Sequence, residues 1–331
     1  MKNENTRALR EGARMVALTA VLMLLNRFVP LFSVIGVFAC GVPMAALAAR
    51  NGFKVIIPAV TAVFFVAVLL GDGIVAAVST ILMSILPGAV AGYMLGRRKP
   101  FFYSIFATAL VVCLGWVFEL VVIEFLIGKG IDEMFAEVIE QTKALMKGVT
   151  DTLGETLAKD NGITPEALTE TLFGALEFVM RLYFPSIVVI SSLFAGYITV
   201  RVSGFVIKRA KLAPIAVLPF SHIRATRGMA VISVLAYLLF MFTNAESSFG
   251  AVLANVVLIM HSILAVCGLS FIDFKLKGSI KAAPARFLIY GAVMMLGGIL
   301  VSIISNILIM IGILDSGRDF RGLETGNGTG L

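Results

Sequence analysis

The sequence predicts an all-α protein, built as a polytopic transmembrane helical bundle. Of its 331 residues, 59% are hydrophobic and 14% charged, whereas soluble proteins average roughly 45–50% and about 25%. The mean hydropathy is +1.00, and the apolar residues form long runs separated by polar loops. The net charge of +7 does not indicate nucleic-acid binding, because the basic residues are spread over several loops instead of forming one patch.

The apolar runs predict about nine membrane spans, since a helix needs about twenty mainly apolar residues to cross a bilayer. The first two runs are separated only by a short stretch that contains Asn26, Arg27 and Pro30. If they form one broken segment, the chain has eight spans. The last run could also end early and re-enter. The runs cover residues 15–29, 31–49, 55–70, 74–95, 101–127, 172–200, 229–245, 249–272 and 287–314.

The basic residues predict the orientation of the spans. Nineteen of the 27 Lys and Arg residues fall on the N-terminal segment and on alternate loops that share its side of the membrane. Cytoplasmic loops carry an excess of such residues. We therefore expect the N-terminus inside and, with nine spans, the C-terminus outside.

Loop lengths divide the chain into four parts. A six-span membrane domain covers residues 1–205 and contains an outer amphipathic segment at 129–171. A basic inner elbow covers 206–228, where Pro214 and Pro219 prevent a regular helix; its charges serve topology or contact a partner protein. A three-span extension covers 229–314. The Gly-rich tail, 315–331, is expected to be disordered.

The outer segment 129–171 is the one long polar excursion between spans. Ile131, Phe135, Val138 and Ile139 begin an apolar pattern at helical spacing, which predicts an amphipathic helix. Nine acidic residues in the segment disfavour binding to anionic lipid. Its apolar face is expected to pack on the outer ends of the spans, either as a rigid extension or as a lid over a site.

Motifs for common chemistry are absent from the sequence. It contains no phosphate loop, no HExxH zinc motif and no GxSxG nucleophile motif. The three cysteines lie in apolar runs without metal-ligand spacing. His261 lies in an apolar run, where it could relay protons or hydrogen-bond a neighbouring helix. We expect no enzyme activity, no cofactor and no metal.

Two apolar runs carry ionisable residues that a membrane span normally lacks. Glu119 and Arg181 each lie about nine residues from a span end on the same predicted side, roughly 13 Å deep. They could therefore meet. Such residues are costly in a bilayer and usually mark a functional site. The candidate ligand-binding residues are Trp116, Glu119, Glu124, Glu177, Arg181 and Tyr183.

The chemistry of this cluster allows two interpretations. Its three glutamates and one arginine favour a cationic or zwitterionic ligand, with Trp116 and Tyr183 as aromatic faces. Alternatively, Glu119 and Arg181 form a structural ion pair that holds two helices together. The first interpretation predicts an outward cavity lined by Trp116, Glu119, Glu177 and Arg181, and the second predicts that these groups are packed without a cavity.

Small residues and turns carry a resemblance to a known family. The stretches are residues 13–20 (ARMVALTA), 71–74 (GDGI) and 86–97 (LPGAVAGYMLGR), the last containing GxxxGxxxG. Over about residues 8–205 the chain resembles the S components of energy-coupling-factor (ECF) vitamin transporters. As a whole it resembles the YybS-like family of uncharacterised bacterial polytopic membrane proteins, which is similar to those S components.

The resemblance implies an architecture, a docking surface and a cellular location. S components have six helices, a ligand site that opens outward and a small-residue face on the first helix that docks a transmembrane coupling subunit. Here that face would contain Ala13 and Ala17. The resemblance also implies a bacterial cytoplasmic membrane. Because the sequence has no ATPase motif, ATP-driven transport would need separate ATPase subunits.

Two functional hypotheses follow. In the first, the protein is a solute-binding component of a transporter and captures an unidentified small molecule from the outer side. In the second, it is a non-transporting scaffold or regulatory subunit of an envelope complex, which it contacts through its basic inner loops and its outer helix.

Overall fold

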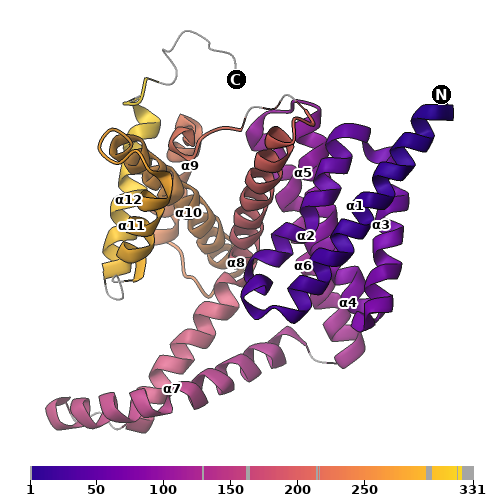
Figure 1. The fold of residues 1–331 in the computed structure, drawn as a ribbon. Helices are drawn as coiled ribbons and strands as arrows, with labels where there is room; N and C mark the ends of the chain where they lie inside the picture. The colour runs from indigo at the N-terminus through magenta and orange to yellow at the C-terminus, as the bar shows by residue number, and fades with distance from the viewer. Residues whose placement is uncertain are drawn as a thin grey trace. The chain divides into compact units, whose positions relative to one another are not determined.

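The structure is a computed structural model that describes residues 2–128, 130–161, 165–213, 215, 217–295, 300–318 and 320–322. These residues form helices and connecting turns, and no strand occurs among them, which confirms the all-α prediction. The chain divides into two compact units, Met1–Ile215 and Ala216–Leu331 (Figure 1). The division falls within the predicted elbow, 206–228.

The N-terminal unit is a helical bundle with a long helical pair attached. The elements are α1 (Lys2–Phe28), α2 (Pro30–Asn51), α3 (Phe53–Ala67), η1 (Val68–Asp72), α4 (Gly73–Thr80), η2 (Ile81–Ile85), α5 (Leu86–Gly96), α6 (Phe101–Ile127), α7 (Ile131–Asn161) and α8 (Pro165–Arg209). The membrane-length stretch Gly73–Gly96 contains a π-helical turn, η2, whereas η1 spans a kink at Gly71, whose backbone dihedrals are not helical.

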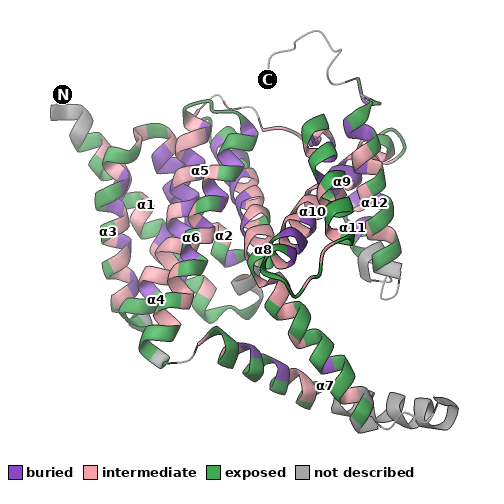
Figure 2. Ribbon diagram, turned by 180° about the vertical axis from the view of Figure 1, so that it is seen from behind, coloured by how far each residue is buried: buried purple, intermediate pink, exposed green. Residues whose placement is uncertain are grey.

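Small residues hold α2 and α5 in backbone contact. A Cβ atom added to Gly92 would lie 2.0 Å from the Ala45 carbonyl oxygen, and one on Gly88 would lie 2.2 Å from that of Gly41. Only glycine allows the backbones of two helices to approach so closely, and the GxxxGxxxG stretch of α5 therefore lies buried against α2. Figure 2 shows α5 as largely buried. The small-residue pattern therefore serves packing within the chain.

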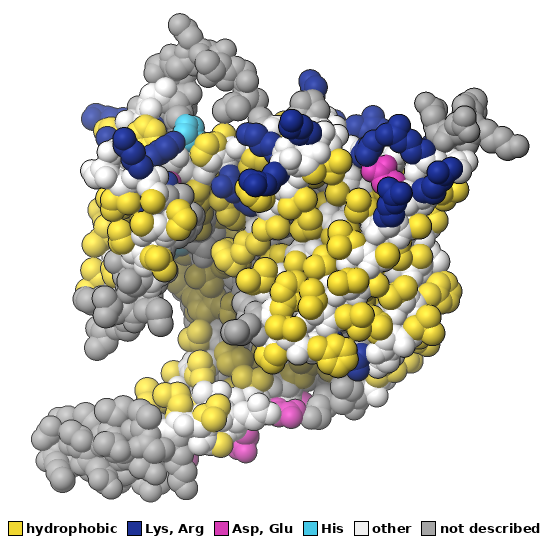
Figure 3. Space-filling view, in the orientation of Figure 1, with side chains coloured by type: hydrophobic (Ala, Val, Ile, Leu, Met, Phe, Trp, Pro, Cys, Tyr) yellow, Lys and Arg dark blue, Asp and Glu magenta, His cyan; other side chains and the backbone are white. Residues whose placement is uncertain are grey.

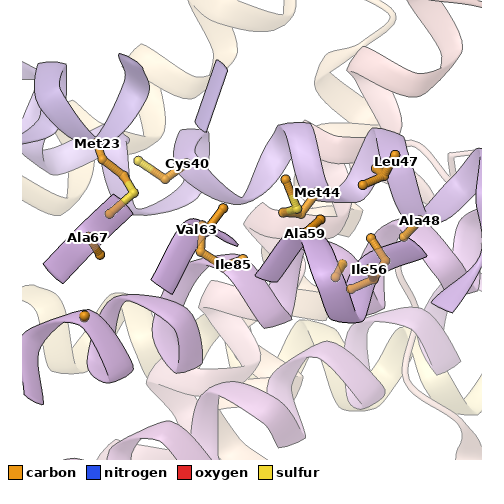
Figure 4. Close-up of a cluster of buried hydrophobic side chains, with 12 residues drawn as sticks. Met23, Cys40, Met44, Leu47, Ala48, Ile56, Ala59, Val63, Ala67 and Ile85 are labelled. Carbon is orange, nitrogen blue, oxygen red and sulfur yellow. The ribbon is translucent and has the colours of Figure 1, made fainter. Parts of the chain in front are cut away.

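Apolar side chains of α1 to α5 form the core of this unit. Met44, Leu47, Ile56, Val63 and Ile85 are at most 1% exposed (Figure 4). Between helices in a bilayer, close van der Waals packing of such side chains supplies the association energy. The core lies on the side of α2 that faces α3 and α5, so these three helices form a fixed frame.

Among the described residues, five helical stretches are long and apolar enough to cross a membrane: Phe53–Gly71, Gly73–Gly96, Phe101–Leu126, Thr169–Arg209 and Ser248–Leu276. They match five of the predicted runs. Ile35–Asn51, Arg227–Met241 and Ser302–Gly317 are apolar but shorter. Within the predicted run 287–314 the structure describes α11 up to Met295 and α12 from Leu300, and residues 296–299 lie outside the described residues. The first run lies in α1 beside charged residues. The count of nine spans therefore stays a prediction.

The basic residues of the N-terminal unit gather at one end of the bundle, beside a broad hydrophobic surface (Figure 3). This is the end where α2 and α5 finish and where α3 and α6 begin. Lys54, Arg97, Arg98 and Lys99 are exposed there. At the opposite end, where α1 and α6 finish, Arg27 is exposed.

The outer segment forms a helical pair with the first half of α8. Phe135 and Ile139 of α7 are buried, and the Phe135 ring packs edge-on against Phe184 of α8, with centroids 5.1 Å apart. Lys143 lies over the Phe173 ring. The predicted amphipathic helix is therefore present, and its apolar face packs on α8. The side chains of 147–166 lie outside the described residues.

The C-terminal unit contains η3 (Phe220–His222), α9 (Arg227–Met241), α10 (Ser248–Leu276), α11 (Ala283–Met295) and α12 (Leu300–Gly317). Helices α10 and α12 pack closely because Gly268 and Gly312 have no side chain at their contact. A Cβ added to Gly268 would lie 2.0 Å from the Leu308 carbonyl oxygen, and one added to Gly312 would lie 2.2 Å from the Leu264 carbonyl oxygen.

The beginning of the predicted disordered tail is ordered. Asp315 and Ser316 lie in the last turn of α12 and are buried, and Arg321 is 7% exposed. The Arg321 guanidinium contacts Asp315 at 2.7 Å and donates to the elbow carbonyls of Ser221 and Ile223. The tail prediction was therefore wrong for these residues, because the elbow offers buried carbonyls that need donors. Residues 323–331 lie outside the described residues.

Candidate functional site

A cavity of about 650 Å³ lies at the end of the N-terminal bundle that is opposite to its basic end. Small-molecule sites typically measure roughly 300–1,000 Å³. Five segments of the unit supply its wall: α1, the start of α2, the α4–η2 stretch, α6 and α8. The lining residues are Met23, Asn26, Arg27, Val37, Phe38, Cys40, Ala76, Ser79, Thr80, Met83, Ser84, Val112, Trp116, Glu119, Ser191, Phe194 and Ala195.

The π-turn η2 shapes one wall of the cavity. Ser79 and Ser84 lie on either side of the start of this turn, and both line the cavity. A π-turn adds a residue to the helical repeat, so it changes which side chains face a neighbour, and such turns are frequent at functional sites. Ser84 Oγ donates to the Val37 carbonyl of α2. Gly115 of α6 packs against Met83 and Leu82 of η2, which brings α6 close to this wall.

Glu119 is the acidic residue on the cavity wall. The Ser79 hydroxyl of α4 donates to its Oε1 atom. No other interaction of the Glu119 side chain occurs within the described part of the chain, so Oε2 has no hydrogen-bond donor among the described residues. A carboxylate accepts hydrogen bonds at both oxygens, and Glu119 lies on the wall of the cavity.

Trp116 lies one helical turn before Glu119 and lines the same cavity. Residues three apart on a helix share a face. The indole is 36% exposed, so its ring is accessible. Trp116 and Glu119, two of the predicted ligand-binding residues, therefore line the same cavity.

Asn26 and Arg27 of α1 form the opposite, positively charged part of the wall. The Arg27 guanidinium donates to the Leu70 carbonyl of η1, beside Gly71, whose φ of +85° is left-handed. The Asn26 Oδ1 atom is buried near Gly36 and has no hydrogen-bond donor among the described residues. These two residues were interpreted only as a break between two spans. Their polarity within an apolar run was the signal that could have placed them in the site.

Arg181 does not reach this cavity. It forms salt bridges with Glu177 at 2.9 Å and with Asp132 of α7, and all three side chains are substantially exposed. The predicted meeting of Glu119 with Arg181 is therefore wrong. The reason is the position of α8, which begins at Pro165, so that Ser191 lies at the cavity and Arg181 lies about 15 Å further along the helix.

The other predicted ligand residues also lie outside the cavity lining. Glu177 pairs with Arg181, and Glu124 is exposed near the end of α6. Tyr183 is half-buried on α8. The structure therefore brings two of the six predicted residues, Trp116 and Glu119, into one cavity.

The predicted docking residues Ala13 and Ala17 are exposed on α1, whereas Gly12 and Thr19 are buried. Ala13 also lines a shallow groove of about 290 Å³ between α1 and α3, together with Val55 and other apolar residues. Ala13 and Ala17 are therefore accessible on the surface of the N-terminal unit.

His261 of α10 packs beside Tyr237 of α9, with ring centroids 5.4 Å apart. In the described residues, no group of three or more His, Cys, Asp or Glu side chains is arranged to hold a metal ion.

Comparisons with known proteins identify relatives but no activity. A family model described as "Predicted membrane protein (DUF2232)" matches residues 17–316. The chain is 25% identical over 280 residues to the "Uncharacterized protein YybS" of Bacillus subtilis (strain 168), covering 82% of this chain and 85% of that protein. No solved structure matches the chain. The YybS-like resemblance is thus confirmed, and neither comparison bears on the resemblance to S components.

Proposed function

Because the chain belongs to the DUF2232 family of predicted membrane proteins, we propose that it captures a small solute from the outer side of a bacterial cytoplasmic membrane. The solute occupies the cavity that contains Glu119. The observation that carries this proposal is the Glu119 carboxylate, which lies in a membrane-length apolar helix and has one oxygen without a hydrogen-bond donor among the described residues.

The energetics of the bilayer support a binding role. A charged side chain in an apolar span costs several kcal/mol unless it has partners, and Ser79 supplies only one hydrogen bond to Glu119. A cavity of about 650 Å³ beside it has room for a ligand that supplies more. A purely structural carboxylate would be expected to have its second oxygen paired with the protein.

The distribution of charge supports an outward opening. The exposed Lys and Arg residues gather at the other end of the N-terminal bundle (Figure 3). Under the positive-inside rule that end faces the cytoplasm, so the cavity opens on the outer side. In this orientation the N-terminus is inside.

Transport, if it follows capture, needs further subunits. The sequence has no phosphate loop for ATP hydrolysis. The exposed Ala13 and Ala17 on α1 offer a small-residue surface that another transmembrane helix can approach closely. This fits the docking of a coupling subunit, as the S-component resemblance implies.

A second candidate function is a scaffold, and the helical pair of α7 and α8 favours it. Leu172, Leu176, Phe178 and Val179 of α8 are between 36% and 47% exposed. They lie in the half of α8 that extends past the cavity, where a protein partner could bind. The scaffold hypothesis requires no ligand, so a ligand screen separates the two functions.

The test compares two matched glutamates on α6. The purified protein is melted in detergent with vitamins, amines, amino acids and other metabolites, beside Glu119→Gln and Glu124→Gln. A ligand at 100 times its Kd stabilises by about 2.7 kcal/mol, which gives a measurable shift. We expect a compound that stabilises the wild type and Glu124→Gln, and whose effect is lost in Glu119→Gln.

Two results would contradict the proposal. If no compound stabilises the wild type, capture is wrong and the scaffold hypothesis gains support. If a compound stabilises the wild type and Glu119→Gln equally, it binds outside this cavity.

A further inference from the structure

We infer that the captured solute binds Glu119 through a protonated amine that donates at least two hydrogen bonds, and that an apolar body carries this amine. This inference rests on the proposed function and specifies the chemical class of its ligand.

The first argument is the carboxylate on the cavity wall. Glu119 is the one acid among the described lining residues, and its Oε2 atom has no hydrogen-bond donor among the described residues. A charged donor makes a hydrogen bond to a carboxylate that is roughly twice as strong as a bond between neutral groups. Because a charge in an apolar span is costly unless it has partners, a cationic donor stabilises Glu119 more than a neutral donor does.

Arg27 lines the cavity but does not supply this donor. Its guanidinium donates to the Leu70 carbonyl and lies 6.0 Å from the centroid of the Phe28 ring. Neither Leu70 nor Phe28 lines the cavity. Arg27 is thus held by groups outside the lining, and the amine is recognised by acceptors that belong to other helices.

The second argument concerns the hydroxyl groups on the wall. Three serines line the cavity, and each donates its proton within the protein: Ser79 to Glu119, and Ser84 and Ser191 to backbone carbonyls. A hydroxyl has one proton and two acceptor lone pairs, so these three oxygens can only accept hydrogen bonds from a ligand. Because Ser79 is bonded to Glu119, a head group at Glu119 meets at least two acceptors.

A protonated primary amine suits these acceptors, because it has three donors and no acceptor. An alcohol has one donor and no charge. A quaternary ammonium group has the charge and no donor. The wall should therefore distinguish a primary amine from both of these groups.

The third argument is the apolar part of the lining. Trp116, Phe38 and Phe194 bring aromatic rings to the wall, and Met23 and Met83 add flexible side chains. Aromatic faces attract ammonium groups and stack on rings, and Met adapts to irregular shapes. A small, fully polar amine would leave this surface without contacts, so the ligand has an apolar body.

The experiment compares four chemical forms of two aromatic bodies. A phenyl and an indolyl group on a two-carbon chain are each tested as the primary amine, the trimethylammonium analogue, the alcohol and the carboxylate. Amines of this kind have pKa values near that of lysine, about 10.4, so they are cations at pH 7. Ethanolamine is the ninth compound and represents an amine with little apolar surface. Apparent affinities come from thermal stabilisation of the detergent-purified full chain.

The expected order follows from the acceptors on the wall. The primary amines should bind about 10-fold or more tightly than the alcohols and the trimethylammonium analogues, which is the factor expected from one hydrogen bond to a charged group. The carboxylates should give no measurable stabilisation, because they bring a second negative charge to Glu119. Ethanolamine should bind more weakly than both aromatic amines.

Three variants identify the group that recognises the amine. Glu119→Gln replaces the carboxylate with a neutral amide of the same shape, and the primary amines should lose their advantage over the alcohols. Glu124→Gln, on the same helix but outside the cavity lining, should keep the wild-type order. Trp116→Leu should weaken the binding of both aromatic amines and keep the order of the forms, because it changes only the apolar wall. Because the order of the forms is compared within each variant, a general loss of stability does not produce the result.

The outcomes separate this inference from the proposed function. It is overturned if the alcohol or the trimethylammonium analogue stabilises the wild type as well as the primary amine, or if Glu119→Gln keeps the wild-type order. If none of the nine compounds binds, the compound found in the wider screen decides. A primary or secondary amine whose binding needs Glu119 supports the inference, whereas a ligand without such an amine overturns it and solute capture stands. If nothing stabilises the wild type, both are wrong.

Discussion

Replacing Arg321 with methionine is expected to destabilise the C-terminal unit severely. The guanidinium is fully buried and makes six hydrogen bonds: two to Asp315, and one each to the Ser221 carbonyl, the Ser270 hydroxyl and the carbonyls of Ile223 and Cys267. Its five N–H donors are thus all in use. It joins the elbow, α10 and the end of α12.

The magnitude follows from what the substitution leaves behind. Arg321→Met removes the partner of Asp315, whose side chain is 1% exposed and whose Oδ1 atom has no hydrogen bond among the described residues. Breaking a buried ion pair on one side costs about 3–5 kcal/mol. Arg224 lies 3.9 Å from the same carboxylate, so it offsets part of this cost, and we expect a value near the lower limit.

The assay is labelling of Cys267 with a maleimide, read residue by residue by mass spectrometry. Cys267 is 3% exposed and its carbonyl accepts from Arg321, so the thiol reacts when this part of the unit opens. A loss of about 3–5 kcal/mol corresponds to labelling about 100- to 4,000-fold faster, if the unit opens and closes faster than it reacts. Arg318→Met, an exposed arginine three residues earlier, is the control.

A double variant tests whether the unpaired Asp315 carboxylate causes the loss of stability. In Asp315→Leu/Arg321→Met both charges are removed, and this double variant should label more slowly than Arg321→Met alone, because no unpaired buried carboxylate is left. The reasoning is refuted if Arg321→Met labels at the rate of Arg318→Met.

Two further predictions concern packing and pH. Gly92→Val should prevent the folding of the N-terminal unit, because the added Cβ would overlap the Ala45 carbonyl. Gly174→Ala, where the Cβ would have no atom within 4 Å, should raise the free energy of unfolding by about 0.5–1 kcal/mol. The folded yield and the melting temperature of both variants check this, and a well-folded Gly92→Val would contradict it. Burial, assisted by the charges of Lys277 and Arg321, lowers the pKa of His222 below its ordinary 6.5. The folded state therefore binds this proton less well than the unfolded state, so stability is constant above about pH 6.5 and falls as the pH drops from there toward the folded-state pKa. Cys267 labelling against pH should show this fall in the wild type and a shallower one in His222→Gln; equal slopes would contradict it.

The local pattern of the chain predicted its helices well. The apolar runs at 55–70, 74–95, 101–127, 172–200 and 249–272 all coincide with helices of membrane length. Gly88, Gly92 and Gly96 form a GxxxGxxxG pattern in the sequence, and the structure places all three against the backbone of α2. These features depend on composition and on the helical repeat, and both are properties of neighbouring residues.

The candidate site was predicted only in part. Trp116 and Glu119 were found because a charge in an apolar run is costly wherever the helix lies. Arg181 was placed beside them on the assumption that its membrane span ends near Leu172, but in α8 it is Ser191 that lies at the cavity, and Arg181 lies ten residues away from it along the helix. The depth of a residue depends on where its helix is held by neighbours, and hydropathy alone does not determine this.

The sequence alone therefore determined that this is a helical membrane protein, which residues are too polar for their surroundings, and which glycines allow close packing. Only the tertiary structure decided which of these residues meet. Arg27, Ser79 and Glu119 line one cavity although about 40 or more residues separate each from the next, and Arg321 of a Gly-rich tail is fully buried. The physical reason is that the helical repeat specifies the face of the helix on which a side chain lies. The partners of that side chain depend on how separate helices pack against one another. This packing involves contacts between residues far apart in the chain.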